Sequence, residues 1–159
     1  ALAYRPPRGL LHVAVGPAQE VGLSLAPLSS ARWLRLTGAL ELSGLPTLFN
    51  EADTYLGLAP LLGLEAEILP WSGPETQLRL GLRGGWMFST VDAGGLGDCA
   101  ASARSARPCS RPVLEAQVSF LVLDLLRLGV QGYYLPRIRE GESALLGLRP
   151  SIGAQVVLD

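Results

Sequence analysis

Apolar and polar residues alternate with a period of two over much of the chain. Between Gln77 and Ser89, one set of alternate positions holds Leu78, Leu80, Leu82, Trp86 and Phe88. The other set holds Gln77, Arg79, Gly81, Arg83, Gly85 and Ser89. A helix would scatter these residues around its circumference, whereas a strand places the two sets on opposite faces. The segment therefore predicts a β-strand with one apolar and one polar face.

The same pattern predicts seven further strands, so the chain is expected to be all-β. These segments are Leu10–Gly16, Glu20–Pro27, Leu34–Ser43, Tyr55–Ile68, Val113–Asp124, Gly129–Pro136 and Leu146–Leu158. Pro60 and Pro150 fall inside two of them and predict a bulge or a shifted strand end, because proline has no N–H to donate. With 159 residues, we expect one domain spanning 1–159.

From the second predicted strand onward, the connections alternate between short and long. The short ones are Leu28–Ala31, 70–75 and Asp124–Leu128, and the longer ones are Gly44–Asp53, Asp92–Arg111 and Arg137–Ser143. Transmembrane β-barrels have short turns at the periplasmic end and longer loops outside. The alternation favours a closed, antiparallel, up-and-down transmembrane barrel of about eight strands.

The polar faces of the predicted strands combine charged residues of both signs with Gly, Ala and Ser. The lumen of an eight-stranded barrel is just wide enough for side chains, so small residues are expected beside long ones. The charges balance, as buried ions must. We predict a lumenal ion-pair network made of Arg35, Glu41, Glu65, Glu67, Arg79, Arg83, Glu115 and Arg149. Within it, Glu65 and Glu67 are expected within cross-strand reach of Arg79 and Arg83.

Composition favours a membrane barrel over a soluble one. Hydrophobic residues make up 48% of the chain and charged residues only 17%, below the quarter usual for soluble domains. All 13 basic residues are arginine, and arginine tolerates burial better than lysine. No apolar run is long enough for a transmembrane helix, which leaves the barrel as the membrane-spanning option. The net charge of -1 gives no basic field for nucleic acid.

In strand number, alternation and loop asymmetry, the chain resembles the small eight-stranded outer-membrane barrels, such as the transmembrane domain of outer membrane protein A. The resemblance implies an integral outer-membrane protein without a cofactor, in contact with outer-membrane lipid and with other envelope proteins as candidate partners. We also expect a mature form whose export signal has been removed.

Four functions are consistent with such a barrel. We favour a non-enzymatic structural or interaction subunit with a packed, ion-paired lumen. A lipid-modifying enzyme is the second hypothesis, because His12 and Ser24 share the lumenal face near Glu20 and some similar barrels hydrolyse or transfer acyl chains with a His and Ser pair. A lumenal His bonded to a polar neighbour is the simpler interpretation. A small pore is the third hypothesis, and a soluble lipocalin-like ligand-binding barrel is the fourth and most remote.

The longest predicted loop, Asp92–Arg111, contains both cysteines. Cys99 and Cys109 do not form a metal site, because such a site needs about four ligands and His12 is the only histidine. A local disulfide formed in an oxidising compartment is expected, with two free thiols as the alternative. Arg104, Arg107 and Arg111 make this loop a candidate surface for lipopolysaccharide phosphates or a partner protein, although ordinary solvated charges would give the same composition.

Overall fold

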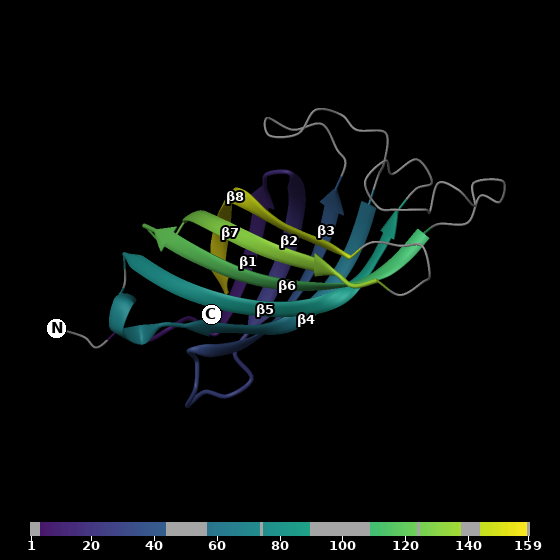
Figure 1. The fold of residues 1–159 in the computed structure, drawn as a ribbon. Helices are drawn as coiled ribbons and strands as arrows, with labels where there is room; N and C mark the ends of the chain where they lie inside the picture. The colour runs from purple at the N-terminus through teal and green to yellow at the C-terminus, as the bar shows by residue number, and fades with distance from the viewer. Residues whose placement is uncertain are drawn as a thin grey trace.

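A computed structural model describes residues 4–43, 57–73, 75–89, 109–123, 125–137 and 144–158 of the chain. It contains eight β-strands and one short 3-10 helix, η1 (Leu69–Trp71) (Figure 1). The strands are β1 (Gly9–Val15), β2 (Ala18–Leu25), β3 (Leu34–Ser43), β4 (Gly57–Glu67), β5 (Thr76–Ser89), β6 (Cys109–Val122), β7 (Leu126–Leu135) and β8 (Leu145–Leu158). The expected all-β fold is confirmed.

The strands form one closed antiparallel barrel. Each strand pairs with its neighbours in the chain, and β1 closes the barrel against β8. The pairing is staggered: successive Cα partners around the barrel are Leu158, Gly9, Leu25, Leu36, Leu64, Leu82, Ala116, Gly132 and Leu148. The path returns to β8 ten residues from its start, a shift of about 33 Å around eight strand spacings of about 4.8 Å. The strands therefore tilt by about 40° from the barrel axis, as closure requires.

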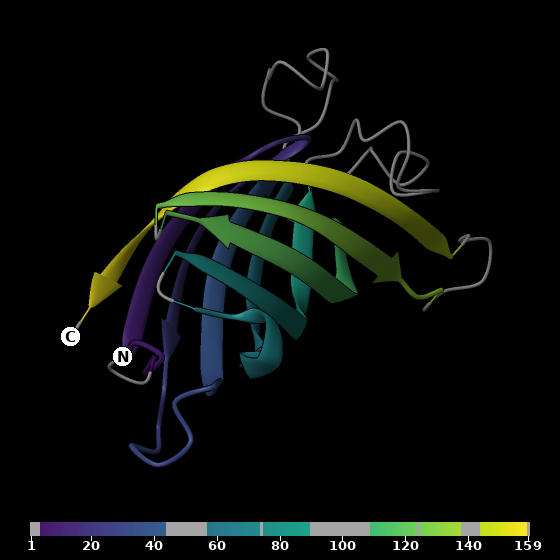
Figure 2. The same cartoon turned by 90° about the vertical axis from the view of Figure 1, so that its left-hand side faces the viewer.

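The two ends of the barrel differ in their connections. Residues 26–33, 68–75 and 123–125 connect strands at one end, which also holds the start of β1 and the end of β8 (Figures 1 and 2). We call it the short-link end. The other end, which we call the long-link end, holds the tight turn 16–17 and the strand ends between which the sequence runs through residues 44–56, 90–108 and 136–144.

The faces of the strands divide sharply by polarity. All charged residues within the eight strands are buried, whereas the outward positions carry exposed apolar side chains such as Leu62 (75%), Leu82 (65%) and Leu148 (79%). The charged side chains of the strands therefore face the interior, and the outward positions are mostly apolar. In the described part of the chain, no helix has the length and apolar character needed to cross a membrane.

The predicted strands match the observed ones closely, with two informative differences. The segment Leu34–Ser43 has the same bounds in the structure as in the prediction. In contrast, β6 begins at Cys109 and β7 at Leu126, earlier than the alternation suggests. The expectation that Arg111 lies in the outer loop is wrong: it lies in β6, paired with Met87, and its side chain is buried. Its guanidinium reaches the carbonyl oxygen of Pro136 at 3.1 Å, which accounts for an inward orientation.

Neither Pro60 nor Pro150 ends its strand. At Pro60 the β4–β5 ladder is interrupted, since Leu58 and Leu61 pair with β5 and the two residues between them do not. Pro150 pairs with Val130 of β7. The ladder between β8 and β1 extends only from Leu158 to Ile152, so Pro150 has no partner in β1. Each proline thus lies beside a gap or an end in one of its two ladders, while it keeps a partner in the other: Leu40 for Pro60 and Val130 for Pro150.

Candidate functional site: the barrel interior

The polar side chains of all eight strands converge on the lumen. All eight residues of the predicted network are at most 7% exposed: Arg35, Glu41, Glu65, Glu67, Arg79, Arg83, Glu115 and Arg149. Together with Glu20 and Arg127, they form two layers along the barrel, one with an acidic excess and one with a basic excess. Because buried ions are costly unless paired and hydrogen-bonded, the contacts within each layer decide what the interior can do.

The acidic layer, nearer the long-link end, consists of Glu20, Glu41, Glu115, Arg83 and Arg149. The Nη2 atom of Arg83 lies 2.6 Å from Glu20 Oε2 and 2.7 Å from Glu115 Oε2, so one guanidinium bridges two carboxylates. Arg149 bridges Glu41 and Glu115 in the same way. Three carboxylates thus face two guanidiniums.

The basic layer, nearer the short-link end, consists of Arg35, Arg79, Arg127, Glu65 and Glu67. Arg35 lies 3.4 Å from Glu65 and 2.7 Å from Glu67. Arg79 is 3.9 Å from Glu65 and 4.0 Å from Glu67, and Arg127 is 3.6 Å from Glu65. Glu65 therefore contacts three guanidiniums, and the layer contains three cations and two anions.

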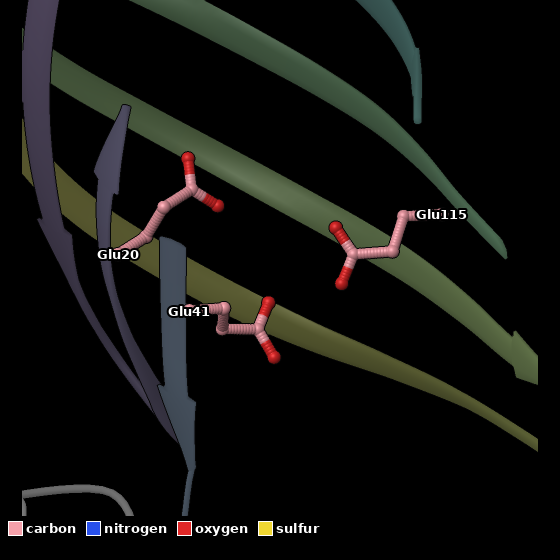
Figure 3. Close-up of side chains that lie close together, drawn as sticks. All are labelled: Glu20, Glu41 and Glu115. Atoms are coloured by element: carbon pink, nitrogen blue, oxygen red, sulfur yellow. The ribbon is translucent and has the colours of Figure 1, made fainter. Parts of the chain in front are cut away.

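The three carboxylates of the acidic layer could be mistaken for a metal centre. Glu20, Glu41 and Glu115 come from β2, β3 and β6, and their carboxyl groups point toward one another (Figure 3). One oxygen of each lies within 4.8 Å of the others. However, the guanidiniums of Arg83 and Arg149 already bridge them, so the cluster is explained as an ion-pair network.

His12 lies in the lumen, as expected, but its contacts do not build a nucleophilic pair with Ser24. Its Nε2 atom is 2.6 Å from Glu20 Oε1, and its ring packs against Gly22, where an added Cβ would come within 2.4 Å of the ring. The hydroxyl of Ser24 instead donates to Thr37 Oγ1 at 3.1 Å. This is the arrangement of a lumenal histidine bonded to a polar neighbour.

Comparison with known proteins does not assign the chain to a family. No protein-family model and no curated protein matches the chain. The chain is an eight-stranded closed antiparallel barrel, and the resemblance to the outer membrane protein A family stays a prediction from the sequence.

Apolar side chains pack across the lumen at the long-link end. Ala59, Leu61, Met87, Val113 and Leu135 form one buried cluster. Four of these five residues are at most 1% exposed and Met87 is 7% exposed, so β4, β5, β6 and β7 contribute a buried apolar part of the interior at this end.

The segment before β1 covers the other end of the lumen. Tyr4 donates to Glu67 Oε1 at 2.5 Å, and Pro6 and Pro7 are buried behind it. Burial, together with the neighbouring carboxylate of Glu67, raises the pKa of the Tyr4 phenol above its usual value, so the phenol remains a donor. The lumen is thus filled from an apolar cluster through two ionic layers to this segment.

Several lumenal residues lie outside the predicted network. The sequence places Glu20 only beside His12, and it assigns Arg127 to a connection because the predicted start of β7 is too late. Gln131 also joins the acidic layer: its amide donates to Glu20 Oε2 at 3.0 Å and its carbonyl accepts from Arg149 Nε at 3.0 Å. Alternate residues of β7, such as Gln131, face the lumen. Extending this alternation back to Leu126, where β7 begins, places Arg127 in the lumen as well.

The predicted loop sites lie mostly outside the described residues. This holds for Cys99, Arg104 and Arg107, so the disulfide and the basic loop surface stay predictions. Cys109 is described only as the first residue of β6.

Proposed function

We propose that this protein is a non-enzymatic integral outer-membrane β-barrel that acts as a structural or interaction subunit and has a closed lumen. One observation carries the proposal: the outward face of the strands has no charged residue, while every strand charge is buried inside. Soluble proteins rarely expose apolar patches beyond a few hundred Å², and here the apolar surface extends over all eight strands. Hydrocarbon is the solvent that fits such a surface.

The dimensions of the apolar band support this environment. The stretch from Leu78 to Phe88 on β5 rises about 33 Å along the strand, or about 25 Å along the axis at a tilt of about 40°. Outer-membrane barrels have an apolar band of about this height. Exposed aromatic residues lie at both of its edges: Trp86, Phe88 and Tyr134 toward the long-link end, and Trp33 and Trp71 at the short-link end. This is the placement of interfacial belts.

The asymmetry of the connections supports an orientation. Outer-membrane barrels keep short turns in the periplasm and longer loops outside. By this rule the short-link end faces the periplasm, and the connections 44–56, 90–108 and 136–144 face outward. The outer loops are then the surface for lipopolysaccharide or a partner protein, because loops on a rigid scaffold usually carry function.

The filled lumen favours a structural or interaction role over a pore. The apolar cluster, the two ionic layers and the segment holding Tyr4 follow one another along the barrel. Open aqueous channels generally need more strands than eight. A planar-bilayer measurement is therefore expected to show no discrete conductance steps.

Two matched substitutions test the membrane assignment. Leu82→Arg places a charge in the middle of the outward face of β5, and Leu123→Arg places one in the 123–125 connection. The two leucines are similarly exposed, at 65% and 73%. In a bilayer the first substitution should cost about 2–4 kcal/mol and the second about 0–1 kcal/mol. The free energy of unfolding, measured by urea titration in lipid vesicles, separates the two cases.

The wild-type control is the heat-modifiability of the barrel on a denaturing gel, together with its retention in carbonate-washed membranes. A soluble barrel would tolerate both arginines equally and would remain monodisperse without detergent. Either result would contradict the proposal.

A further inference from the structure

The first half of β8 lacks a neighbour on one of its two sides among the described residues. On the β7 side, the ladder extends from Leu145 to Ala154. On the β1 side, it begins only at Ile152, which pairs with Val15, the last residue of β1. Figure 2 shows β8 continuing past the turn between β1 and β2. We call Leu146–Arg149 the β8 edge.

The backbone groups of β8 alternate between its two sides. The amide of Gln155 donates to the oxygen of Leu125 at 3.0 Å, on the β7 side. Because successive strand residues direct their backbone groups to opposite sides, the odd-numbered residues of β8 face β7 and the even-numbered ones face away from it. The oxygen of Pro150 fits this rule, since a Cβ added to Gly16, directly after β1, would lie 2.5 Å from it. The even-numbered residues of the β8 edge therefore direct both N–H and C=O toward the unpaired side.

The β8 edge lies at the level of the apolar band. Three steps between direct Cα partners connect it to the middle of β5: Leu148, Gly132, Ala116 and Leu82. At a strand tilt of about 40°, each step away from β5 rises about 3 Å toward the long-link end. Leu148 therefore lies about 9 Å beyond Leu82, near the level of Trp86. In the proposed bilayer, unpaired backbone groups are costly at this depth, because hydrocarbon offers them no hydrogen bonds.

The side chains of the β8 edge are sorted between its two faces. Leu146 and Leu148 are 82% and 79% exposed, the highest values among the large apolar side chains of the described residues. On the lumenal face, the guanidinium of Arg149 lies 5.1 Å from the centre of the Tyr133 ring. A Cβ added to Gly147 would overlap the Tyr133 hydroxyl, so this ring fills the space beneath the edge. The edge is thus supported from the lumen and open outward.

A second copy of the chain does not fit this edge. Two copies in one bilayer cross it in the same direction, and a two-fold axis along the membrane normal relates them. Strands tilted by about 40° would then cross at about 80°, so two β8 edges cannot form a ladder. An extended segment of a different protein is free of this constraint and can run antiparallel to β8.

From these observations we propose that the β8 edge is a docking site for an extended strand of a partner protein. The strand continues the sheet beyond the end of β1 and bonds to the backbone of Leu146 and Leu148, which is recognition by strand addition. Its side chains are apolar toward lipid, beside those two leucines, and small toward the lumen, beside Gly147 and Arg149. The inference rests on the proposed function, because it needs the edge in hydrocarbon.

Amide hydrogen exchange of the folded protein in micelles, followed residue by residue by NMR, is the first test. The probe is a seven-residue peptide of alternating valine and serine with blocked ends. Without peptide, the amides of Leu146 and Leu148 should exchange at least about tenfold faster than those of Gly147 and Arg149, which face β7. With peptide, the amides of Leu146 and Leu148 should become protected to a similar degree.

Binding of the same peptide with a fluorescein label, measured by anisotropy, is the second test. Leu146→Pro with Leu148→Pro removes both donors, and the natural Pro150 shows that this side of β8 accommodates proline. Leu146→Ala with Leu148→Ala is the matched control, because it removes the same side chains and keeps both amides. The proline variant should weaken binding at least about tenfold, whereas the alanine control should stay within about threefold of wild type.

Four results would overturn the proposal. Protection of the Leu146 and Leu148 amides without peptide would show that this chain covers its own edge. Protection that rises with protein concentration would make a second copy the occupant. The other two results are no binding of the peptide to wild type and equal binding by the proline and alanine variants. If the proline variant does not fold, the exchange measurement on wild type decides.

The comparison is made on protein that is heat-modifiable and retained in washed membranes. If wild type fails those two controls, the proposed membrane function itself is wrong. If it passes them and its β8 edge is covered or binds no peptide, only the docking site is wrong.

Discussion

The opposite charge imbalance of the two lumenal layers predicts a crossed pattern of mutational effects. Among the described residues, the acidic layer has three carboxylates to two guanidiniums, and the basic layer has three guanidiniums to two carboxylates. Removing a cation should therefore lower the free energy of unfolding strongly in the acidic layer and only slightly in the basic layer. Removing an anion should show the reverse.

In the acidic layer the contrast is between Arg83→Met and Glu41→Gln. Arg83 bridges Glu20 and Glu115, so its loss leaves two buried carboxylates without that partner, and breaking a buried pair in this way costs about 3–5 kcal/mol. Glu41 contacts only Arg149 among the described cations, and its Oε1 atom has no hydrogen-bond partner there. Because Arg149 keeps Glu115, Glu41→Gln should cost about 1 kcal/mol or less.

In the basic layer the contrast is between Glu65→Gln and Arg127→Met. Glu65 lies within ion-pair distance of three guanidiniums, and its loss should again cost about 3–5 kcal/mol. Arg127 contacts Glu65 alone among the described carboxylates, at 3.6 Å, so its replacement should cost about 1 kcal/mol.

Urea titration in lipid vesicles, followed by tryptophan fluorescence, gives the free energy of unfolding of all four variants. Expected differences of about 2 kcal/mol or more within each layer exceed the usual extrapolation error. Equal losses within a layer, or the opposite order, would refute the reasoning that charge balance within each layer governs stability.

Three further predictions concern the backbone and the cysteines. Gly63→Ala should abolish the folded band on an unboiled gel, because its Cβ would lie 2.0 Å from the backbone oxygen of Leu82, whereas Gly38→Ala, with only a Leu62 methyl group at 3.3 Å, should leave it unchanged. Leu123→Gly should raise the urea midpoint, since Leu123 has a φ of 55° and relief of that left-handed conformation is worth about 1 kcal/mol; an unchanged or lower midpoint would contradict this. The thiols of Cys99 and Cys109 should react with a maleimide only after reduction, and labelling of the unreduced protein would rule out the disulfide.

The sequence is sufficient to predict the architecture because a single physical pattern generates it. Alternation assigns each strand residue to the lumen or to the exterior, so the burial of Arg35, Glu41 and Glu115 follows from parity alone. Proline and arginine obscure the start of β6, since Arg111 and Pro112 have the composition of a loop. The strand persists there because Arg111 finds backbone acceptors inside the barrel.

The partners within the lumen could not be predicted in the same way. Arg79 lies near Glu65 and Glu67, as the adjacent strands suggest. Arg83 meets Glu115, its direct partner in the β5–β6 ladder, but it also reaches across the lumen to Glu20. Contacts across the barrel depend on the stagger and tilt of all eight strands together. Those quantities follow from the closure of the barrel and are not visible in any one strand.

If the barrel occupies the membrane proposed above, the span of its lumenal contacts along the chain bears on how it would enter the bilayer. Arg83 meets Glu20 over 63 residues, Arg149 meets Glu41 over 108, and Gln131 meets Glu20 over 111. A hairpin that entered hydrocarbon alone would bring charges whose counterparts were still outside, at a cost of several kcal/mol for each. Insertion and closure are therefore expected to be one concerted event, in which first and last strands meet before the arginines lose contact with water.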